Sequence, residues 1–511
     1  MRDVMKLCLM GILVIGMAVA SASCKKENPA KLSTELLPLE GNPLVHLKVL
    51  IKVGSAYDPT GKEGLAQLTW SIMADGGSRL LSIKEITEKF YPLAASVGLD
   101  VDKEMSVFSG TIHRDNLEAF YVIFKDMLLD PGFREDDFNR IRTNQLNFVE
   151  KTLVSNMDEE FGKQILNLML YEGHPYSHLM AGTAESVKSL TLDEVKAFYK
   201  EHFVQGNVTI GLAGGYPADF ALKIAADFEK LPATFTPTLS LPEPRLPNGL
   251  EFILAEKQTP ATAISMGFPV SLNRSSADFF ALWIAGAHFG EHRQHLSLLF
   301  QKIREERGQN YGDYAYIEHF IQGRDKFPAT NNARQQQSFS IWIRPLANSN
   351  RHFVIRQALL ELRRLVEDGI SEERFELTRT YLLNYTKLYA QTLGERLGWQ
   401  MDSHYYGYPD FLTEVQARLP KLTRDDVNRA IKKHLNFNNL YVAVITQDGE
   451  ALKKALVENA ASPVGYANPN MPKDVLDEDK LIQEYRLDVK PENVRVIPAS
   501  EFFQKKGLPQ K

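Results

Sequence analysis

Cysteine is nearly absent from this sequence, since only two occur in 511 residues. A network of disulfides therefore cannot be the basis of the fold, and a zinc site built from several cysteines is also excluded. Low-complexity tracts and long blocks of like charge are missing too, and the formal net charge is −5. This acidic balance argues against a nucleic acid as the partner. The length allows two or more hydrophobic cores, as in a large globular protein.

The sequence also lacks an apolar run long enough for a permanent transmembrane helix. Its N-terminal run, Leu7–Ala20, has about 14 residues, whereas a helix that crosses a bilayer needs about 20. Basic residues flank the start of this run and small residues follow its end, which is typical of a secretory signal peptide. We therefore expect residues 1–23 to be removed from the mature protein.

The expected cleavage site leads directly into a cysteine. The segment Ser21–Cys24 resembles the lipobox of bacterial lipoproteins, in which the cysteine is diacylated and becomes the mature N-terminus. The alternative is an ordinary cleavage site beside a chance cysteine. The only other cysteine, Cys8, lies inside the leader. We expect a lipid anchor at Cys24, a polar tether over residues 24–40, and a position in the bacterial cell envelope facing the periplasm.

A repeat within the chain sets its organisation. Residues 190–195 read LTLDEV, and residues 422–427 read LTRDDV, 232 positions later. In each copy a threonine precedes two acidic residues in the first turn of an expected helix, and an Asn-containing loop and a β-branched strand follow. A single match of this kind can arise by chance, because helix-loop-strand units are common. Other features recur with it.

Both halves show the same order of secondary-structure signals. Expected strands lie at 44–53 and 250–268, and expected helices at 64–73, 277–287, 135–153 and 352–368. A Pro-rich passage separates the copies. The sequence thus predicts an α+β fold with two similar domains, 41–231 and 249–460, joined by a linker at 232–248. Residues 461–511 are expected to form a tail over the surface, in which 488–497 could add a strand.

Four further stretches, in a fixed order, point to a known family. They read GSAYDPTGKEGLA at 54–66, LYEGHPY at 170–176, LTLDEVKAFYKEHF at 190–203 and LFQKIREERGQNY at 299–311. With the repeat, they make the chain resemble the insulinase (pitrilysin) metallopeptidases, and within them the bacterial and mitochondrial processing-peptidase branch. The resemblance covers most of the mature length. It implies two domains, each a mixed or antiparallel sheet packed with helices, that form a clamshell.

The zinc motif of that family is degenerate in this chain. Active members place H-x-x-E-H on a helix directly after the Gly-Leu-Ala segment, so that two histidines hold zinc and the glutamate acts as general base. Here Gln67 and Ser71 stand at the histidine positions, and Trp70 stands at the base position. An amide and a neutral hydroxyl bind zinc poorly, and an indole does not accept a proton at neutral pH. We expect no metal in this chain.

The remaining zinc ligand of the family is a glutamate on a helix further along the chain. The resemblance places Val149 at this position, with Glu150 one residue away. A single helical carboxylate is more often part of a solvated face than a ligand, and without the histidines Glu150 has no metal to hold.

A literal H-x-x-E-H does occur in the second half, at His288–His292. It follows an expected helix and contains Gly290, so we expect it at a helix end or in a loop, where the two rings need not face the same way. A self-sufficient enzyme that uses His288 and His292 stays open as the least favoured function.

Other chemistry of the family is retained. In its second domain an arginine holds the substrate backbone, and a tyrosine seven residues later supports the developing oxyanion. Arg304 and Tyr311 match this spacing. A guanidinium is a fixed fork of donors suited to peptide carbonyls, and a phenol can donate to an oxyanion in a dry site. A surface arginine and a packed tyrosine would be the plain alternative.

These observations favour one function and leave a second open. In two-chain members of the family one subunit supplies zinc, and the other supplies the Arg/Tyr pair. We expect this chain to be the second kind, a peptide-binding subunit that is inactive alone and works with a zinc-holding partner carrying H-x-x-E-H on peptide or unfolded protein substrates. The alternative is an envelope lipoprotein that binds peptide or protein without hydrolysis.

Overall fold

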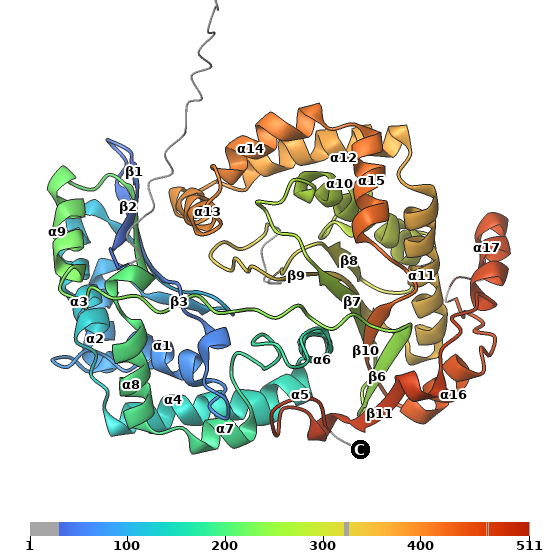
Figure 1. Cartoon of the computed structure of the whole chain (residues 1–511), viewed down its shortest axis with the longest axis horizontal. Helices are drawn as coiled ribbons and strands as arrows, with labels where there is room; N and C mark the ends of the chain where they lie inside the picture. The colour runs from blue at the N-terminus through green and yellow to red at the C-terminus, as the bar shows by residue number, and fades with distance from the viewer. Residues whose placement is uncertain (1–29, 321–326, 467, 469, 510–511) are drawn as a thin grey trace, which may run out of the picture.

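The computed structural model describes residues 30–320, 327–466, 468 and 470–509 (Figure 1). The expected leader and the lipidation site at Cys24 lie outside these residues. The described chain forms two halves, each with its own sheet and helices, which face one another across a central space (Figure 1). Among the described helices, none is both long and apolar enough to cross a membrane.

The first half is built on a five-stranded sheet in the order β1-β5-β2-β4-β3. β1 and β5 are parallel, and all other neighbours are antiparallel. Its strands are β1 (Ser33–Pro38), β2 (Leu44–Ile51), β3 (Gly98–Val101), β4 (Ser106–His113) and β5 (Val208–Gly214).

The second half repeats this topology. Its sheet has the order β11-β6-β10-β7-β9-β8, in which β6 and β10 are parallel and β10, β7, β9 and β8 are mutually antiparallel neighbours. Its strands are β6 (Leu250–Glu256), β7 (Thr262–Val270), β8 (Gly312–Tyr316), β9 (Gln337–Leu346), β10 (Leu440–Thr446) and β11 (Val494–Pro498). β5 and β10 are separated by the same 232 residues as the sequence repeat. The prediction of two similar α+β domains is confirmed.

Helices cover the sheets. Those of the first half are α1 (Leu65–Asp75), α2 (Ile83–Phe90), α3 (Leu117–Leu129), α4 (Glu135–Asn147), α5 (Leu153–Asn156), α6 (Asp158–Leu170), α7 (Ala184–Ser189), α8 (Leu192–His202) and α9 (Ala218–Phe228). Those of the second half are α10 (Phe279–Gly290), α11 (Arg351–Asp368), α12 (Glu372–Tyr385), α13 (Leu393–Tyr405), α14 (Phe411–Arg418), α15 (Arg424–His434), α16 (Gly449–Val457) and α17 (Lys473–Gln483).

The repeated helices begin as their sequence predicts. Thr191 accepts a hydrogen bond from the backbone N–H of Glu194, whose carboxylate in turn accepts from the backbone N–H of Thr191, and this capping box starts α8. Thr423 and Asp426 form the same box at α15. Each box satisfies backbone donors that the first turn would otherwise leave unpaired.

Two expectations about the chain's connections need correction. The expected tether reaches residue 40, but residues 33–38 form β1, because their backbone pairs in parallel with β5. The stretch at 250–268, which we expected to be strand-like, forms the two strands β6 and β7. The tail that we expected over the surface is packed into the fold, since the rings of Phe502 and Phe503 are buried, and β11 extends the second sheet where a strand at 488–497 was considered. The expected linker is extended and crosses between the halves (Figure 1).

A shared hydrophobic core joins the halves. α6 belongs to the first half by sequence, yet Phe161 and Ile165 on this helix lie in one cluster with Ile253 and Ile445 of the second sheet. Phe161 also packs against Phe502, with ring centroids 5.6 Å apart. The C-terminal segment therefore fastens both halves, and the two sheets cannot separate without exposing this core.

Candidate functional site

The degenerate zinc positions lie on α1, directly after a sharp turn. Gly64 starts the helix with a φ of 95°, a conformation that favours glycine. The Asp58 carboxylate accepts hydrogen bonds from the backbone N–H groups of Gly64 and Ala66, each at 2.7 Å. One turn later the Gln67 side-chain amide donates to the Ser71 hydroxyl at 3.0 Å. Gln67 and Ser71 thus satisfy one another where two histidines would hold zinc.

Trp70 points away from these two side chains. It is fully buried, and its ring packs at 5.8 Å from Phe198 and 6.4 Å from Phe203 of the first half. The position that carries the general base in active enzymes therefore belongs to the hydrophobic core here. No proton acceptor stands beside Gln67 and Ser71 at this position.

Gln67 and Ser71 line a cavity of about 400 Å³. The wall opposite α1 includes Gln145, which is buried and donates from its side-chain amide to the carbonyls of Gly64 and Ala181 at 2.9 and 3.0 Å. Sequence reasoning missed Gln145. The signal that could have found it is its position: Gln145 lies on α4, within the stretch 135–153 that was expected to be the helix carrying the third ligand.

Neither residue considered for the third ligand lines this cavity. Both lie in a π-helical turn, Phe148–Thr152, which continues α4. Val149 is fully buried, and the Glu150 carboxylate forms an ion pair with Lys188 at 2.5 Å. Glu150 therefore takes part in a surface pair.

The cavity continues into a space between the two halves. A second cavity, of about 330 Å³, shares Phe148, Glu160, Gln164 and Met180 with the first and is closed by side chains of the second half. One of these is Trp342, whose ring lies 3.8 Å below the Lys163 ammonium group. Burial lowers the pKa of Lys163 to about 8. The zinc-motif positions thus open toward an interdomain chamber lined by both halves.

A buried ion pair closes the far side of this chamber. Arg334 donates to both carboxylate oxygens of Asp102, at 2.5 and 3.0 Å, and His319 lies 3.2 Å from the same carboxylate. Burial alone would raise the pKa of Asp102, but Arg334 and then His319 lower it well below its usual value. Lys103, next in the chain, is also buried, and burial lowers its pKa to about 7.

Arg304 and Tyr311 lie together, as their spacing predicts. Arg304 is in a second π-helical turn, Phe300–Glu305, with its guanidinium 5.4 Å from the centre of the Tyr311 ring and 4.7 Å from that of Phe300. It donates to the Tyr311 carbonyl at 3.3 Å. Tyr311 is 72% exposed. Neither residue lines the interdomain chamber, so both present their polar groups at the surface.

The two histidines of the literal H-x-x-E-H have different surroundings. α10 ends at Gly290, between them. His288 lines a cavity of about 550 Å³, whereas His292 is buried, shares a 2.7 Å hydrogen bond with the Tyr316 hydroxyl and packs against Tyr314. Burial lowers the pKa of each histidine to about 4. In the part of the chain that the structure describes, no three His, Cys, Asp or Glu side chains gather as a metal site.

Comparisons with known proteins agree with this geometry. The family model described as insulinase (peptidase family M16) matches residues 38–181, and the model described as peptidase M16 inactive domain matches residues 189–382. A relative from Helicobacter pylori, described as non-peptidase homolog YmxG, is 20% identical over 469 residues, which cover 86% of this chain and 97% of the relative.

Solved structures share the fold. A peptidase M16 inactive domain from Pseudomonas fluorescens aligns with a TM-score of 0.72 at 21% identity, over 82% of this chain and 96% of that one. The periplasmic protease PqqL from Escherichia coli aligns with a TM-score of 0.65 at 15% identity. That alignment covers 89% of this chain and 49% of PqqL, so the chain spans about half of that protease.

Proposed function

Because the chain belongs to the insulinase-like M16 family, in its inactive branch, we propose that it is the peptide-binding, non-metal subunit of a zinc endopeptidase. In this role it supplies substrate-binding and oxyanion-stabilising groups to a catalytic partner, which carries H-x-x-E-H and holds the zinc. The observation that carries the proposal is the contrast between the two halves. The metal chemistry is gone at Gln67, Trp70 and Ser71, while Arg304 and Tyr311 remain together and accessible.

The first half supports the non-metal part of this role. The Gln67 amide is used in a bond to Ser71, and neither group is a good zinc ligand. Trp70 is held in the core by Phe198 and Phe203, so a rotation that would place a base at the cavity is not available. Hydrolysis by this chain alone would lack both the metal-bound water and the group that deprotonates it.

The second half supports the complementing part. The Tyr311 hydroxyl is free to donate to an oxyanion that forms in another subunit, because the residue is exposed at the surface. The guanidinium of Arg304 is oriented by two aromatic rings and one backbone carbonyl, which leaves further donors for a peptide carbonyl. These two groups are ordered by each other before any partner binds.

The place of action follows from the N-terminal sequence. We propose that Cys24 carries a lipid and holds the protein at the bacterial envelope with the fold facing the periplasm. With β1 beginning at Ser33, only a short segment separates the anchor from the first sheet. Peptides or unfolded segments in the envelope are the substrates that such a complex would meet.

A second function is favoured by the locked halves and by the relative described as a non-peptidase homolog. A shared core and the buried Asp102–Arg334 pair join the two halves around the interdomain chamber. A protein of this kind can bind peptide or another envelope protein without any catalytic partner. The two functions differ in whether Arg304 and Tyr311 contribute to turnover.

The deciding experiment is to purify the protein from its native envelope, identify the chain that accompanies it, and measure peptide hydrolysis by the reconstituted pair. Tyr311→Phe removes one oxyanion donor and should lower turnover by about 100- to 1,000-fold. Arg304→Ala should also weaken peptide binding, because it removes a contact made in the ground and transition states. Zinc content should be the same in both variants.

Tyr91→Phe is the matched control, since Tyr91 is an exposed tyrosine of the first half. It should leave turnover unchanged. Wild-type turnover in both the Tyr311 and Arg304 variants would instead favour the non-catalytic binding function.

A further inference from the structure

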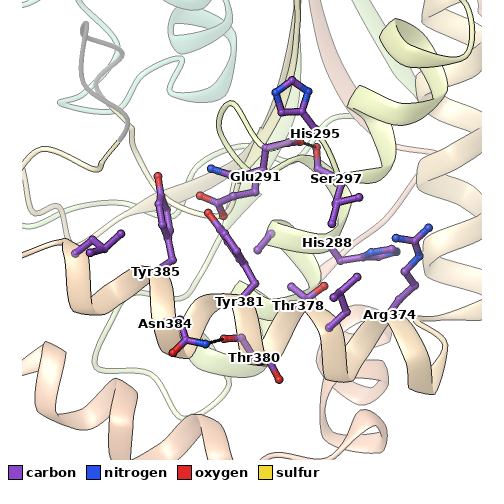
Figure 2. Close-up of a pocket in the computed structure, with 15 residues that line it drawn as sticks. His288, Glu291, His295, Ser297, Arg374, Thr378, Thr380, Tyr381, Asn384 and Tyr385 are labelled. Atoms are coloured by element: carbon purple, nitrogen blue, oxygen red, sulfur yellow. Dashed lines mark hydrogen bonds between the residues drawn. The ribbon is translucent and has the colours of Figure 1, made fainter.

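The largest of the cavities described above is separate from both the degenerate zinc positions and the Arg304/Tyr311 pair. It has a volume of about 550 Å³ and lies inside the second half, between the C-terminal end of α10, the segment that follows it, and α12 (Figure 2). None of Gln67, Ser71, Arg304 and Tyr311 lines it. A ligand here would therefore bind separately from the peptide site.

Most of its rim is apolar and open to solvent. Leu296, Leu377 and Leu388 line it and are 58%, 44% and 48% exposed. Exposed leucines gathered around one opening favour a ligand with an apolar body, since burying them against it removes apolar surface from water. Tyr381 and Tyr385, stacked with centroids 4.9 Å apart, continue this wall along α12.

Two polar groups meet inside the cavity, one from each side. Figure 2 shows the carboxyl of Glu291 and the phenol of Tyr381 reaching toward one another from opposite walls. The Tyr381 hydroxyl is buried, and the hydroxyl of Tyr385, which also lines the cavity, lies beside it as a hydrogen-bond neighbour. Among the residues that the structure describes, the carboxyl of Glu291 accepts only from the backbone N–H of His292. Glu291 is half-buried, so its carboxyl is open to a ligand in the cavity, and the Tyr381 hydroxyl oxygen lies where such a ligand can reach it.

The charges around this point favour a cation. Burial raises the pKa of Glu291 to about 7, and the contact with the His292 N–H only partly offsets this. Burial and then the Glu291 carboxylate raise the pKa of Tyr381, so its hydroxyl stays neutral. The one guanidinium of the cavity, Arg374, lies at the end near His288 and donates to Gln301 (Figure 2).

We propose that this cavity binds a primary ammonium group attached to an apolar body. The ammonium donates to the Glu291 carboxylate and to the Tyr381 hydroxyl oxygen, and the faces of Tyr381 and Tyr385 lie beside it. The apolar body covers the rim formed by Leu296, Leu377 and Leu388. Such a group is found in a free alkylamine and in the N-terminal residue of an apolar peptide.

Calorimetry of the full mature chain tests the proposal with three probes of equal length: hexylammonium, 1-hexanol and hexanoate. Hexylammonium should bind at least tenfold more tightly than hexanol. Glu291→Gln should weaken hexylammonium by about 10- to 100-fold, because a charge-assisted hydrogen bond is lost, and should leave hexanol unchanged. Tyr381→Phe should weaken hexylammonium several-fold.

Glu373→Gln is the matched control, since Glu373 is an exposed residue of α12 that does not line the cavity. It should bind hexylammonium as wild type does. A peptide amide that begins with phenylalanine, compared with its N-acetylated form, separates the two sources: binding of the free form alone assigns a peptide N-terminus, whereas binding of hexylammonium alone assigns a small amine.

Other results would overturn the proposal. Equal affinity for hexylammonium and hexanol would show an apolar hole without recognition of charge. Preference for hexanoate, lost in Arg374→Gln, would assign an anion site at the other end of the cavity. Absence of binding by all probes, or unchanged hexylammonium binding in Glu291→Gln, would remove the site.

Discussion

Replacing Arg334 with methionine should destabilise the whole molecule, because Asp102 would then be buried without its main partner. Asp102 and Arg334 are 2% and 4% exposed, and two hydrogen bonds join them across the halves. Breaking a buried pair from one side costs about 3–5 kcal/mol, since one charge stays desolvated. His319, 3.2 Å away, offsets only part of this loss.

The expected change in thermal midpoint follows from the size of the chain. An unfolding entropy of about 2.1 cal/mol/K per residue, over roughly 470 described residues, gives about 1 kcal/mol/K. The midpoint of Arg334→Met should therefore fall by about 3–5 °C, measured by calorimetry at pH 7. Arg363→Met is the control: it removes an exposed pair with Glu367 and should shift the midpoint by about 1 °C or less.

The pH dependence gives a second check. In the wild type Arg334 lowers the pKa of Asp102. The pair therefore contributes fully to the free energy of unfolding above the unfolded carboxyl pKa of about 3.9, and this contribution is lost as the pH falls through the lowered pKa of the folded state. In Arg334→Met burial should raise the pKa of Asp102 instead, and protonation then relieves the unpaired charge. The gap in midpoint between the two proteins should be smaller at pH 5 than at pH 8. A gap below 1 °C at both pH values would refute the reasoning.

Three further predictions concern metal, anchor and core. The purified chain should bind no stoichiometric zinc and show no chelator-sensitive peptidase activity; elemental analysis near one zinc per chain, lost in His288→Ala, would support the self-sufficient enzyme. Cys24→Ser should release the protein from the membrane fraction or leave its leader uncleaved, and unchanged membrane association would contradict lipidation. Trp70→Ala should cost about 3–5 kcal/mol in urea unfolding, whereas a loss under 1 kcal/mol would show that the ring is not core.

The sequence predicts those parts of the fold whose signals are local. The helix starts at Thr191 and Thr423 depend on residues three positions apart, and the 232-residue offset between them is also the offset between the strands that follow, β5 and β10. Strand β1 was missed because it is a short edge strand of alternating exposure, and its partner, β5, follows more than 160 residues later. A strand within the tail was considered at 488–497 and β11 forms there, but the burial of Phe502 was missed because its ring packs against Phe161, far away in the sequence.

In the candidate site, too, local features are visible in the sequence, whereas contacts between distant segments are not. The replacement of histidines by Gln67 and Ser71 is visible in the sequence, but the hydrogen bond between them is a property of the folded helix. The seven-residue spacing of Arg304 and Tyr311 is visible in the sequence, whereas the contact between them and their position outside the chamber are properties of the folded chain. Glu291 and Tyr381 come from segments 90 residues apart, so no sequence pattern joins them into one cavity.

The ion pair between the halves also bears on their symmetry. Asp102 lies in the connection from β3 to β4, and Arg334 lies in the connection from β8 to β9, which holds the same place in the repeated topology. Two identical copies that met at this point would set carboxylate against carboxylate, or guanidinium against guanidinium. Two copies of either half that met in this way would therefore place like charges opposite one another at this contact. The contact is attractive only because the halves have become unlike, which commits each half to the other as its one complementary partner.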